Sequence, residues 1–443
     1  MRLCHTEVMA GYAPAMVSPQ RPPSVDSLAR LMADSGLPHA VCVELARQAV
    51  AEGPASFEQG AAVTRANLFA RSLLGPVINA TGVLLHTNLG RAPLHIVHPP
   101  TAMNIEFDLR TGERGSRQHA VGTLLAMLCG AEAAMVVNNN ASAVLLVLAA
   151  IARDRQVVVS RGESVEIGGG FRIPDVMEQS GAHLVDVGTT NRTRLADYRK
   201  AFGRKNADVA AILKVHPSNY RVEGFVETTP IAELTTLDVP VIADIGSGLI
   251  DANCPWLAGP PPAWLHGEPA ARQSLLDGAA LVTFSGDKLF GGPQAGIIAG
   301  RSDLVAMCEQ HPLARALRPG SHVMAAMQRT TLAYLDKTAV TDIPFWAMVA
   351  ATTDDLHTRA GEIIAAAGVG VIEATEAVPG AGSAPGTTIP SIGIRITGDQ
   401  LAVLRSCDPP VVARTRDGST FLDLRTVEPG SDGAVAAALR RCA

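Results

Sequence analysis

The chain has 443 residues, of which 47% are hydrophobic and 18% are charged, and its formal net charge is −5. This composition excludes a disordered chain and fits a folded protein of two or three domains with a large core. The negative charge means that any nucleic acid must bind to a local basic patch, and 32 of the 37 basic residues are arginines.

The N-terminal residues 1–21 lack the basic and apolar pattern of a secretory signal and are predicted to be a loose tail. No apolar run along the chain is long enough to span a bilayer. The seven cysteines have no CxxC spacing, which favours free thiols in a reducing cytoplasm. We therefore predict a cytoplasmic protein without a metal site.

Residues 22–74 carry apolar residues at helical spacing in "VDSLARLMADSG" and "HAVCVELARQAVAEG", each closed by a glycine, and predict a small helical N-terminal domain. Residues 75–337 alternate apolar β-type runs with helical stretches. Such a pattern is typical of a parallel sheet covered on both faces. The predicted strands are "AAMVVN", "QVVVS", "AHLVDV", "VAAILKV", "VPVIADI", "AALVTFS" and "AGIIAG".

Residues 338–443 predict a small α+β C-terminal domain. A helical segment precedes three β-type runs, "IPSIGIRI", "PPVVARTR" and "STFLDLRTV", and a last helix follows them. The stretch "AVPGAGSAPGTTIP" (residues 377–390) is rich in Gly, Pro and Ser and is predicted to be flexible.

Chemically capable residues follow several of the predicted strands, and in open α/β sheets ligands bind at the carboxyl ends of the strands. "NNNASAVLL" begins a helix whose first N–H groups, at Asn140, Ala141 and Ser142, could hold a phosphate; the alternative is an ordinary asparagine cap. Asp244 follows "VPVIA" and needs a cationic partner if it is buried. The remaining polar residues at strand ends are His216, Ser218, Asn219, Ser285, Asp287 and Lys288.

A phosphate seat, a carboxylate and a lysine at different strand ends fit pyridoxal 5′-phosphate, which needs a lysine for its aldehyde and an acid for its ring nitrogen. The predicted cofactor-binding residues are Lys288, Asp244, Asn140, Ala141, Ser142, Asn219 and Ser285. The glycines around Lys288 are interpreted as room for a flat cofactor against the backbone. A surface lysine in a turn is the alternative for Lys288, and Lys214, inside an apolar strand, is the rival lysine.

Long motifs now extend this pattern: "VINATGVLLHTNLGRAPL", "RGSR", "NNNASAVLL", "RGESVEIGGGFRIPDVMEQSGAHLVDVGTTNRT", "VHPSNYRVEGF", "SGDKLFGGPQAGII", "HPLARALR" and "PPVVARTRDGSTFLDLRTVEP". Together they closely resemble the family of bacterial selenocysteine synthases, the L-seryl-tRNA(Sec) selenium transferases. The resemblance runs from about residue 22 to the end.

The resemblance implies the fold of the aspartate-aminotransferase-like class and homo-oligomeric rings, typically decamers built from dimers. It implies conversion of seryl-tRNA(Sec) to selenocysteinyl-tRNA(Sec) with selenophosphate, through an aldimine, β-elimination to aminoacrylyl-tRNA, and selenium addition. The helical N-terminal domain would bind the tRNA, with Arg30 and Arg47 as exposed candidates beside the alternative of a solvated helix face.

Individual site residues also follow from the resemblance. Lys288 matches the lysine that forms the Schiff base, Asp244 matches the partner of the ring nitrogen, and Asp287 matches an acidic residue needed for activity. Arg91, Arg315 and Arg318 match arginines that bind the selenophosphate anion. Without the resemblance, "ARALR" would be interpreted as a solvated helix face.

The chain departs from the family pattern near the site. The segment "HIVHPPTAMNIEFD" (residues 95–108) is shorter than usual, and its double proline argues against a continuous helix. "QHAVGTLL" places an imidazole at His119 and leaves Ala120 where the family has its histidine. "PGS" (residues 319–321) follows Arg318. These departures motivate one alternative, a catalytically weakened tRNA-binding paralogue. A separate alternative is a pyridoxal lyase or β-replacement enzyme acting on a small amino acid; such enzymes share the catalytic fold but lack the N-terminal tRNA-binding domain, so residues 22–74 discriminate the two.

Overall fold

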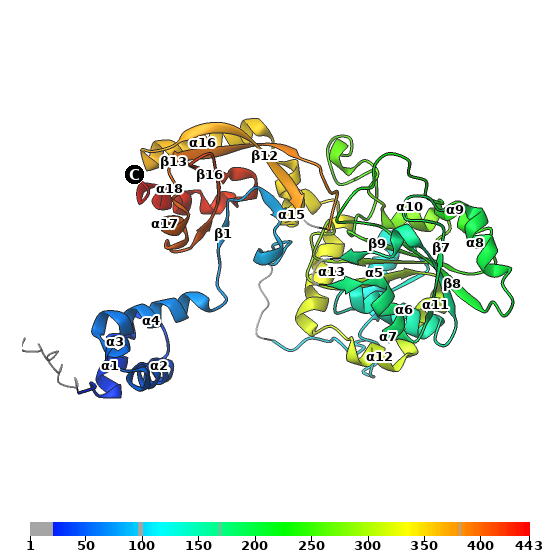
Figure 1. Cartoon of the computed structure of the whole chain (residues 1–443), viewed down its shortest axis with the longest axis horizontal. Helices are drawn as coiled ribbons and strands as arrows, with labels where there is room; N and C mark the ends of the chain where they lie inside the picture. Colours follow the sequence, from blue (N-terminus) through cyan, green and yellow to red (C-terminus); the bar gives the residue numbers. More distant parts are fainter. Residues whose placement is uncertain (1–20, 96–100, 168–169, 381) are drawn as a thin grey trace, which may run out of the picture. The chain divides into compact units, whose positions relative to one another are not determined.

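The computed structural model describes residues 21–95, 101–167, 170–380 and 382–443. Residues 1–20 of the predicted tail, and part of the shortened segment 95–108, lie outside the described residues. The chain divides into two compact units, Met1–Pro76 and Val77–Ala443 (Figure 1). No helix in the described ranges is both long enough and apolar enough to cross a membrane.

The N-terminal unit consists of the helices α1 (Val25–Leu31), α2 (His39–Glu52), α3 (Pro54–Phe57) and α4 (Gln59–Ser72), which confirms the helical prediction for this segment. The side chain of Ser24 caps α1 by accepting the N–H of Ser27. The helices pack their apolar faces around a small core of their own. Its buried residues are Leu28, Ala29, Met32, Leu37, Cys42, Leu45, Ala46, Ala49, Phe57, Ala62 and Ala66.

A seven-stranded sheet forms the centre of the second unit, with strand order β3-β11-β10-β9-β8-β4-β7. All seven predicted strands are present: β3 (Ala133–Val137), β4 (Gln156–Ser160), β7 (His183–Val187), β8 (Val209–Val215), β9 (Val241–Gly246), β10 (Leu281–Ser285) and β11 (Gly296–Gly300). Neighbouring strands are parallel except that β11 is antiparallel to β10 and β3. The connection from β10 to β11 contains no helix, so it is too short for the crossover that a parallel pair requires.

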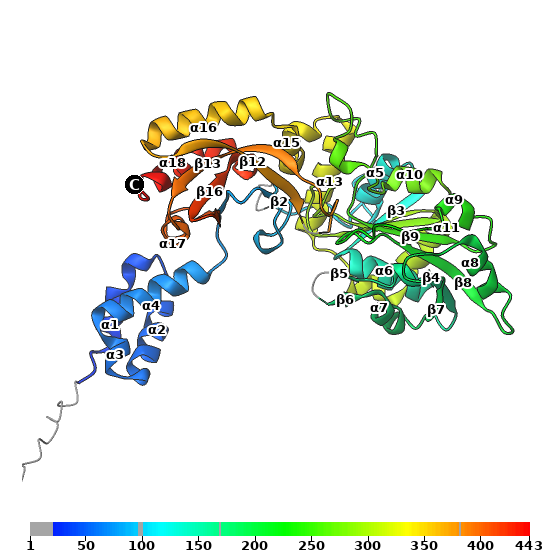
Figure 2. The same ribbon diagram turned by 45° about the horizontal axis from the view of Figure 1, so that its top comes forward.

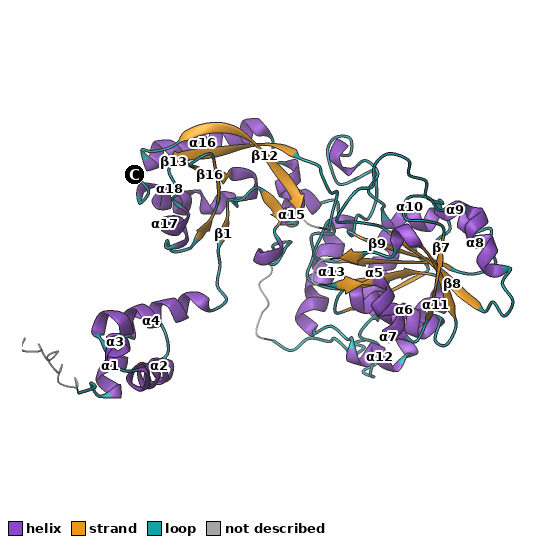
Figure 3. Ribbon diagram, in the orientation of Figure 1, coloured by secondary structure: helices purple, strands orange, loops and turns teal. Residues whose placement is uncertain are grey.

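Helices cover both faces of this sheet (Figure 3). One face packs against α6 (Asn140–Ile151), α7 (Ile173–Ser180) and α11 (Ser302–Gln310). The other face packs against α5 (His119–Cys129), α8 (Leu195–Phe202), α9 (Ile231–Leu234), α10 (Ala271–Leu276) and α13 (Ser321–Leu335). Burial on both sides explains why the strands read as continuous apolar runs.

A five-stranded sheet with order β15-β16-β13-β12-β2 lies in the C-terminal part. Its strands β12 (Val371–Gly380), β13 (Ile389–Thr397), β15 (Arg414–Arg416) and β16 (Ser419–Asp423) pack against α16 (Thr353–Ala367) and α18 (Asp432–Arg440) (Figure 2). Shorter elements complete this part: α14 (Ala339–Asp342), α15 (Pro344–Ala350), α17 (Leu401–Arg405) and β14 (Val411–Val412).

Two short strands from the start of the second unit join this C-terminal part. Strand β2 (Val83–Leu85) runs parallel to β12, pairing Leu85 with Gly380, and β1 (Ile78–Asn79) pairs with β14. The stretch predicted to be flexible, residues 377–390, begins inside strand β12, and Ser383 and Ala384 beyond it are buried. The prediction of flexibility is therefore wrong for the strand residues, because β2 and β13 hold them.

Candidate active site

Lys288 lies just beyond β10, at the carboxyl edge of the seven-stranded sheet, and only 6% of its surface is exposed. Within the described ranges its ammonium group forms no ion pair. Burial lowers the pKa of Lys288 below its ordinary value, and the charge of Arg91 lowers it further against the opposing charges of Asp244, Asp287 and Glu268. A lysine in this environment favours the neutral, nucleophilic amine. The alternative of a surface lysine in a turn is wrong.

The rival lysine, Lys214, already has an ionic partner. Its Nζ lies 2.8 Å from Glu163 Oε1, and Glu163 Oε2 accepts the N–H of Val215 at 3.1 Å. Glu163 is buried, so the pair satisfies a carboxylate that would otherwise be left in the interior. Lys214 is therefore committed to a structural role.

Replacing Lys214 by methionine should lower the free energy of unfolding by about 3 kcal/mol, because it leaves the buried Glu163 unpaired. Denaturant unfolding measures this loss. The variant should still be labelled at Lys288 by pyridoxal phosphate and borohydride. Loss of that label in a folded Lys214→Met protein would contradict the assignment of the two lysines.

Asp244, at the end of β9, is 2% exposed and has no cationic partner within ion-pair distance among the described residues. Its Oδ1 accepts hydrogen bonds from Asn140 Nδ2 at 2.7 Å and from Thr283 Oγ1 at 3.3 Å. Burial raises the pKa of Asp244 above its ordinary value, although these two hydrogen bonds and the charge of Lys288 oppose the shift. The carboxylate is therefore oriented by neutral donors and lacks a close counter-charge.

The start of α6 bears on the two interpretations of "NNNASAVLL", an ordinary asparagine cap or a first turn that holds a phosphate. Asn139 is an ordinary cap, since its side chain accepts the N–H of Ser142 at 2.8 Å. Asn140 instead reaches Asp244, and its Oδ1 is buried without a partner in the described part of the chain. The N–H groups of Asn140 and Ala141 lie in the first helical turn, where no intrahelical acceptor is available. The first turn thus keeps donors for an anion even though Asn139 caps the helix.

A loop after β12 covers Lys288. A Cβ atom at Gly382, where φ is +82°, would lie 2.7 Å from Lys288 Nζ and 3.6 Å from Asn219 Oδ1. Ala384, two residues after Gly382, donates its N–H to Glu268 Oε2 at 3.1 Å. A side chain at position 382 would strain the backbone at this positive φ and would displace the end of Lys288, so this loop lies directly against the lysine.

The glycines that follow β10 have a different role from the one predicted. Cβ atoms at Gly286, Gly291 and Gly292 would lie within 3 Å of protein atoms, namely Pro293 O, Ile343 Cγ2 and the ring of Phe290. These glycines allow close packing of the polypeptide on itself and do not leave room for a cofactor. The interpretation that tied them to a flat ligand is wrong.

Sequence reasoning missed Glu268, a buried carboxylate whose Oε2 lies 3.5 Å from His216 Nε2. Burial raises the pKa of Glu268, but His216 and the N–H of Ala384 outweigh it, and the net pKa is lowered. Glu268 lies in an irregular stretch, so no periodicity or motif marked it. Among the other predicted residues at this edge, Ser285 is buried and Asn219 is exposed.

The three arginines predicted to bind an anion are not brought into contact within this chain. Arg91 Nη1 lies 2.6 Å from Asp287 Oδ2, next to Lys288. Arg318 Nη1 lies 2.9 Å from Glu106 Oε1, while Arg315 is exposed on α12 (Pro312–Ala316). The carbonyl of Leu317 accepts the N–H of Asn138 at 3.0 Å, which places the end of α12 beside the start of α6.

Sequence reasoning also missed the partners of Arg318. Glu106 Oε1 additionally accepts the Nε–H of Arg117 at 3.0 Å. His119 and Ala120, where the chain departs from the family pattern, are both exposed at the start of α5.

Replacing Arg91 by glutamine should raise the pKa of Lys288, because Arg91 is the charge that lowers it and Asp287 would lose its partner. The rate at which the cofactor-free protein captures pyridoxal phosphate should then rise at a higher pH than in the wild type. Stopped-flow absorbance over a pH series measures this shift, with Arg301→Gln as a control at a surface pair. A shift to lower pH would contradict the charge arrangement.

Comparisons with known proteins agree with this fold and identify the family. A sequence profile of the L-seryl-tRNA selenium transferases (SelA) matches residues 77–428. The chain is 47% identical to the L-seryl-tRNA(Sec) selenium transferase of Moorella thermoacetica over 396 residues, covering 83% of this chain and 82% of that protein. It is 41% identical to the enzyme of that name from Geobacter metallireducens, covering 98% of this chain and 95% of that protein.

Among solved structures, D-glucosaminate-6-phosphate ammonia-lyase is similar at a TM-score of 0.56 and 22% identity, covering 84% of this chain and 97% of that chain. This likeness concerns the fold alone, and the predicted aspartate-aminotransferase-like class is confirmed. With the profile covering most of the chain and relatives above 40% identity, the chain belongs to the L-seryl-tRNA selenium transferase family.

Proposed function

We propose that this chain converts seryl-tRNA(Sec) to selenocysteinyl-tRNA(Sec), with pyridoxal phosphate held on Lys288 and selenophosphate as the selenium donor. Family membership supports the overall reaction. The observation that carries the chemistry is a buried lysine, without an ion pair in the described ranges, at the same sheet edge as a buried carboxylate. Burial disfavours the charged form of both side chains, so their burial is unfavourable unless a bound ligand contacts both of them.

The residues present fit pyridoxal phosphate. Lys288 offers an amine of lowered pKa, and Asp244 offers a carboxylate without a close counter-charge for a protonated ring nitrogen. The first turn of α6 offers N–H donors for a phosphate. The buried Ser218 hydroxyl lacks a partner in the described part and adds a polar group beside Gly246. When bound, the cofactor supplies an electron sink for negative charge developing at the serine Cα.

The chain's own residues then move protons and hold the substrates. The amine of Lys288 takes the proton from the serine Cα and returns one after selenium has added. Asp287 Oδ2 holds Arg91 Nη1 at 2.6 Å, and Asp287 is the residue before Lys288. Arg91 is the first of the arginines proposed to bind the incoming anion. Arg315 and Arg318 belong to the same proposal as further anion ligands. The loop at Gly382 and Ala384 excludes water from Lys288.

Binding of the tRNA is proposed for the N-terminal unit. Residues 21–76 contain five arginines and five carboxylates, so attraction must come from local groups and not from net charge. Arg30 pairs with Asp26 at 2.7 Å and Arg47 with Glu44 at 3.5 Å, and all four side chains are exposed. A homo-oligomeric ring built from dimers completes the proposal, and analytical ultracentrifugation tests it.

The deciding experiment is borohydride reduction of the protein with pyridoxal phosphate, followed by peptide mapping, and a parallel assay with seryl-tRNA(Sec) and selenophosphate. A label on Lys288 together with selenocysteinyl-tRNA(Sec) is the expected result. A label on another residue overturns the cofactor site. A label on Lys288 without selenium transfer, but with turnover of free serine, would favour the small-molecule lyase.

A further inference from the structure

Glu268 is a buried carboxylate to which the proposed chemistry gives no role. It is 8% exposed, and it lines a cavity of about 520 Å³ together with His216 and Asp244, at the carboxyl edge of the seven-stranded sheet. A carboxylate in such a position is costly unless hydrogen bonds or a counter-charge compensate its burial. The contacts of Glu268 therefore indicate what it holds in place.

One oxygen of Glu268 joins two segments that are distant in the sequence. Its Oε2 accepts the N–H of Ala384 at 3.1 Å and lies 3.5 Å from His216 Nε2. The backbone N–H of His216 in turn donates to the carbonyl of Asp244 at 2.9 Å. Glu268 thus links the chain beyond β12 to the strand ends that carry His216 and Asp244.

Ala384 has a backbone conformation that alanine does not favour. Its φ is +43°, in the left-handed region, and the residue is only 2% exposed. Such a conformation persists where the surrounding structure imposes it. Both polar backbone groups of Ala384 are held, because Glu268 accepts its N–H and the Thr387 hydroxyl donates to its carbonyl at 2.7 Å.

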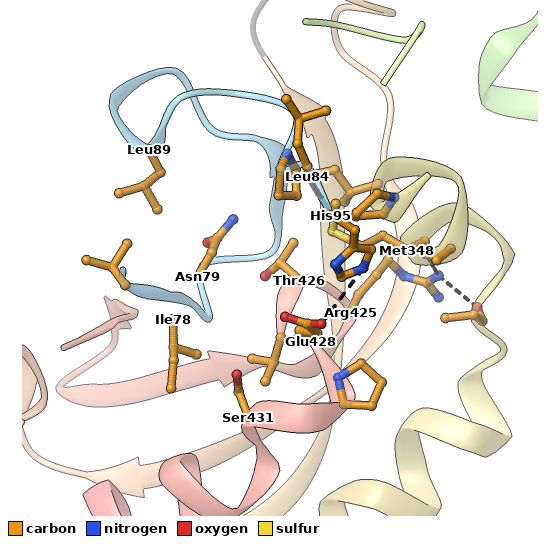
Figure 4. Close-up of a pocket in the computed structure, with 18 of the residues that line it drawn as sticks. Ile78, Asn79, Leu84, Leu89, His95, Met348, Arg425, Thr426, Glu428 and Ser431 are labelled. Carbon is orange, nitrogen blue, oxygen red and sulfur yellow. Dashed lines mark hydrogen bonds and ion pairs between the residues drawn. The ribbon is translucent and has the colours of Figure 1, made fainter. Parts of the chain in front are cut away.

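The strand before this loop is fixed independently of Glu268. Gly380, the last residue of β12, pairs with Leu85 of β2. The preceding residue of β2, Leu84, is buried and lines a separate cavity beside Met348 and Arg425 (Figure 4). The chain therefore enters the loop from a packed strand, and the course of residues 382–386 depends on the contacts of the loop itself.

The same loop covers the reactive lysine. A Cβ atom at Gly382 would lie 2.7 Å from Lys288 Nζ, and Lys288 is 6% exposed. Burial is the main reason why the pKa of Lys288 is lowered. Access of water to the amine, and with it the charge state of the amine, therefore depends on whether the loop stays in place.

We infer that Glu268 is a positioning residue, whose carboxylate holds the loop of residues 382–386 against Lys288 and so keeps water from the reactive amine. This role rests on the proposed function, because it matters to catalysis only if Lys288 is the reactive lysine. Without the acceptor at Glu268, the strained backbone at Ala384 relaxes, the loop opens and the amine is hydrated.

The test uses the full-length protein without cofactor and acetic anhydride as the amine probe. Trace acetylation over a pH series, followed by peptide mapping, gives the labelling rate of Lys288 relative to the exposed Lys337 in the same digest. The limiting rate at high pH measures access to Lys288, and the midpoint of the pH profile measures its pKa.

Two substitutions separate the reach of Glu268 from its charge. Glu268→Asp keeps the charge but withdraws the acceptor, whereas Glu268→Gln keeps a carbonyl oxygen at the same reach and removes the charge. Glu376→Asp is the matched control, since it shortens an exposed glutamate that accepts a bond from Thr388 Oγ1 at 3.3 Å, just beyond the same loop.

Glu268→Asp should raise the limiting rate of Lys288 about tenfold, the effect of losing one hydrogen bond to a charged acceptor on the opening of the loop. Its midpoint should move to higher pH, because the amine is less buried. Glu268→Gln should keep the wild-type limiting rate, and its midpoint should move to lower pH, because the charge of Glu268 raises the pKa of Lys288. Glu376→Asp should match the wild type in both quantities.

Three results would overturn the inference: a wild-type limiting rate in Glu268→Asp, a rise of similar size in Glu268→Gln, or an equal rise in Glu376→Asp. Gly382→Ala is a second variant if Glu268→Asp folds poorly. It disturbs the contact between loop and lysine while leaving Glu268 unchanged, so it should also raise the limiting rate. A wild-type rate in Gly382→Ala would mean that the loop does not limit access to Lys288, and the inference would be wrong.

The labelling experiment is independent of the proposed reaction. It needs no cofactor, tRNA or selenium donor, so a negative result overturns the role of Glu268 and leaves the proposed function intact. Conversely, absence of a borohydride label on Lys288 overturns the proposed cofactor site, whatever the acetylation rates show about the loop.

Discussion

Lys288→Ala should abolish both the visible absorption band of bound pyridoxal phosphate and selenium transfer, with turnover falling by more than about 10³-fold. The amine is the only group proposed both to bind the cofactor aldehyde and to move the Cα proton. Without cofactor the variant should be at least as stable as the wild type, because burying this lysine lowers its pKa and its charged form is disfavoured in the folded state. Absorbance, the transfer assay and thermal unfolding measure the three effects.

Lys337→Ala is the matched control, since Lys337 is an exposed lysine after α13. It should keep the absorption band and the activity of the wild type. Selenium transfer at the wild-type rate by a folded Lys288→Ala protein would remove the basis of the proposed mechanism. Retention of a borohydride label elsewhere would place the cofactor on a different lysine.

Asp244→Asn should lower kcat by about 10²–10³-fold, because the carboxylate that faces a protonated ring nitrogen is lost while the shape of the side chain is kept. Steady-state kinetics with seryl-tRNA(Sec) measures this loss, and KM should change much less than kcat. Thr283→Val, which removes one donor to the same carboxylate, should reduce kcat far less. Equal kcat values for Asp244→Asn and the wild type would exclude Asp244 as the ring partner.

The stability of the cofactor-free protein gives a second readout for Asp244. Its folded-state pKa is raised above 3.8, so the folded chain binds the proton more tightly than the unfolded chain does. Asp244 therefore lowers the free energy of unfolding once the pH rises above 3.8, the ordinary pKa of the group. For this reason Asp244→Asn should raise the melting temperature at neutral pH. With the cofactor bound, the wild type should have the higher melting temperature, since only its Asp244 carboxylate can pair with the protonated ring nitrogen.

The central sheet could be predicted from the sequence because its strands are buried on both faces and therefore read as unbroken apolar runs, such as Val209–Val215. The strands β1 and β2 could not be predicted from the sequence. Val83–Leu85 is too short to show a period, and its partner Val378–Gly380 lies in a stretch whose glycines and prolines suggested a loop. Pairing between segments so distant in sequence is decided by tertiary packing, which local patterns do not record.

The position of Lys288 and Asp244 at one sheet edge also followed from the sequence, because parallel strands end at a common edge. The contacts that set the charge states of these two residues could not be predicted from the sequence. Glu163 binds Lys214, and it lies in the 3-10 turn Arg161–Glu163 of a quoted motif that gave no sign of this partner. Glu268 accepts an N–H from the loop that covers Lys288, and it lies in an irregular stretch without a motif. The interpretation of Gly291 was wrong because a Cβ there would meet Ile343 from a distant part of the chain.

The pairing of β2 with β12 limits how early the C-terminal sheet can form while the chain is being synthesised. Val83 leaves the ribosome early, but its partner Val378 is translated only near the end, so the C-terminal sheet cannot close until almost the whole polypeptide exists. Until then β2 presents an unpaired backbone edge that other nascent chains can join. A premature stop before β12 would therefore yield an aggregation-prone product, even though every strand of the seven-stranded sheet had already been made.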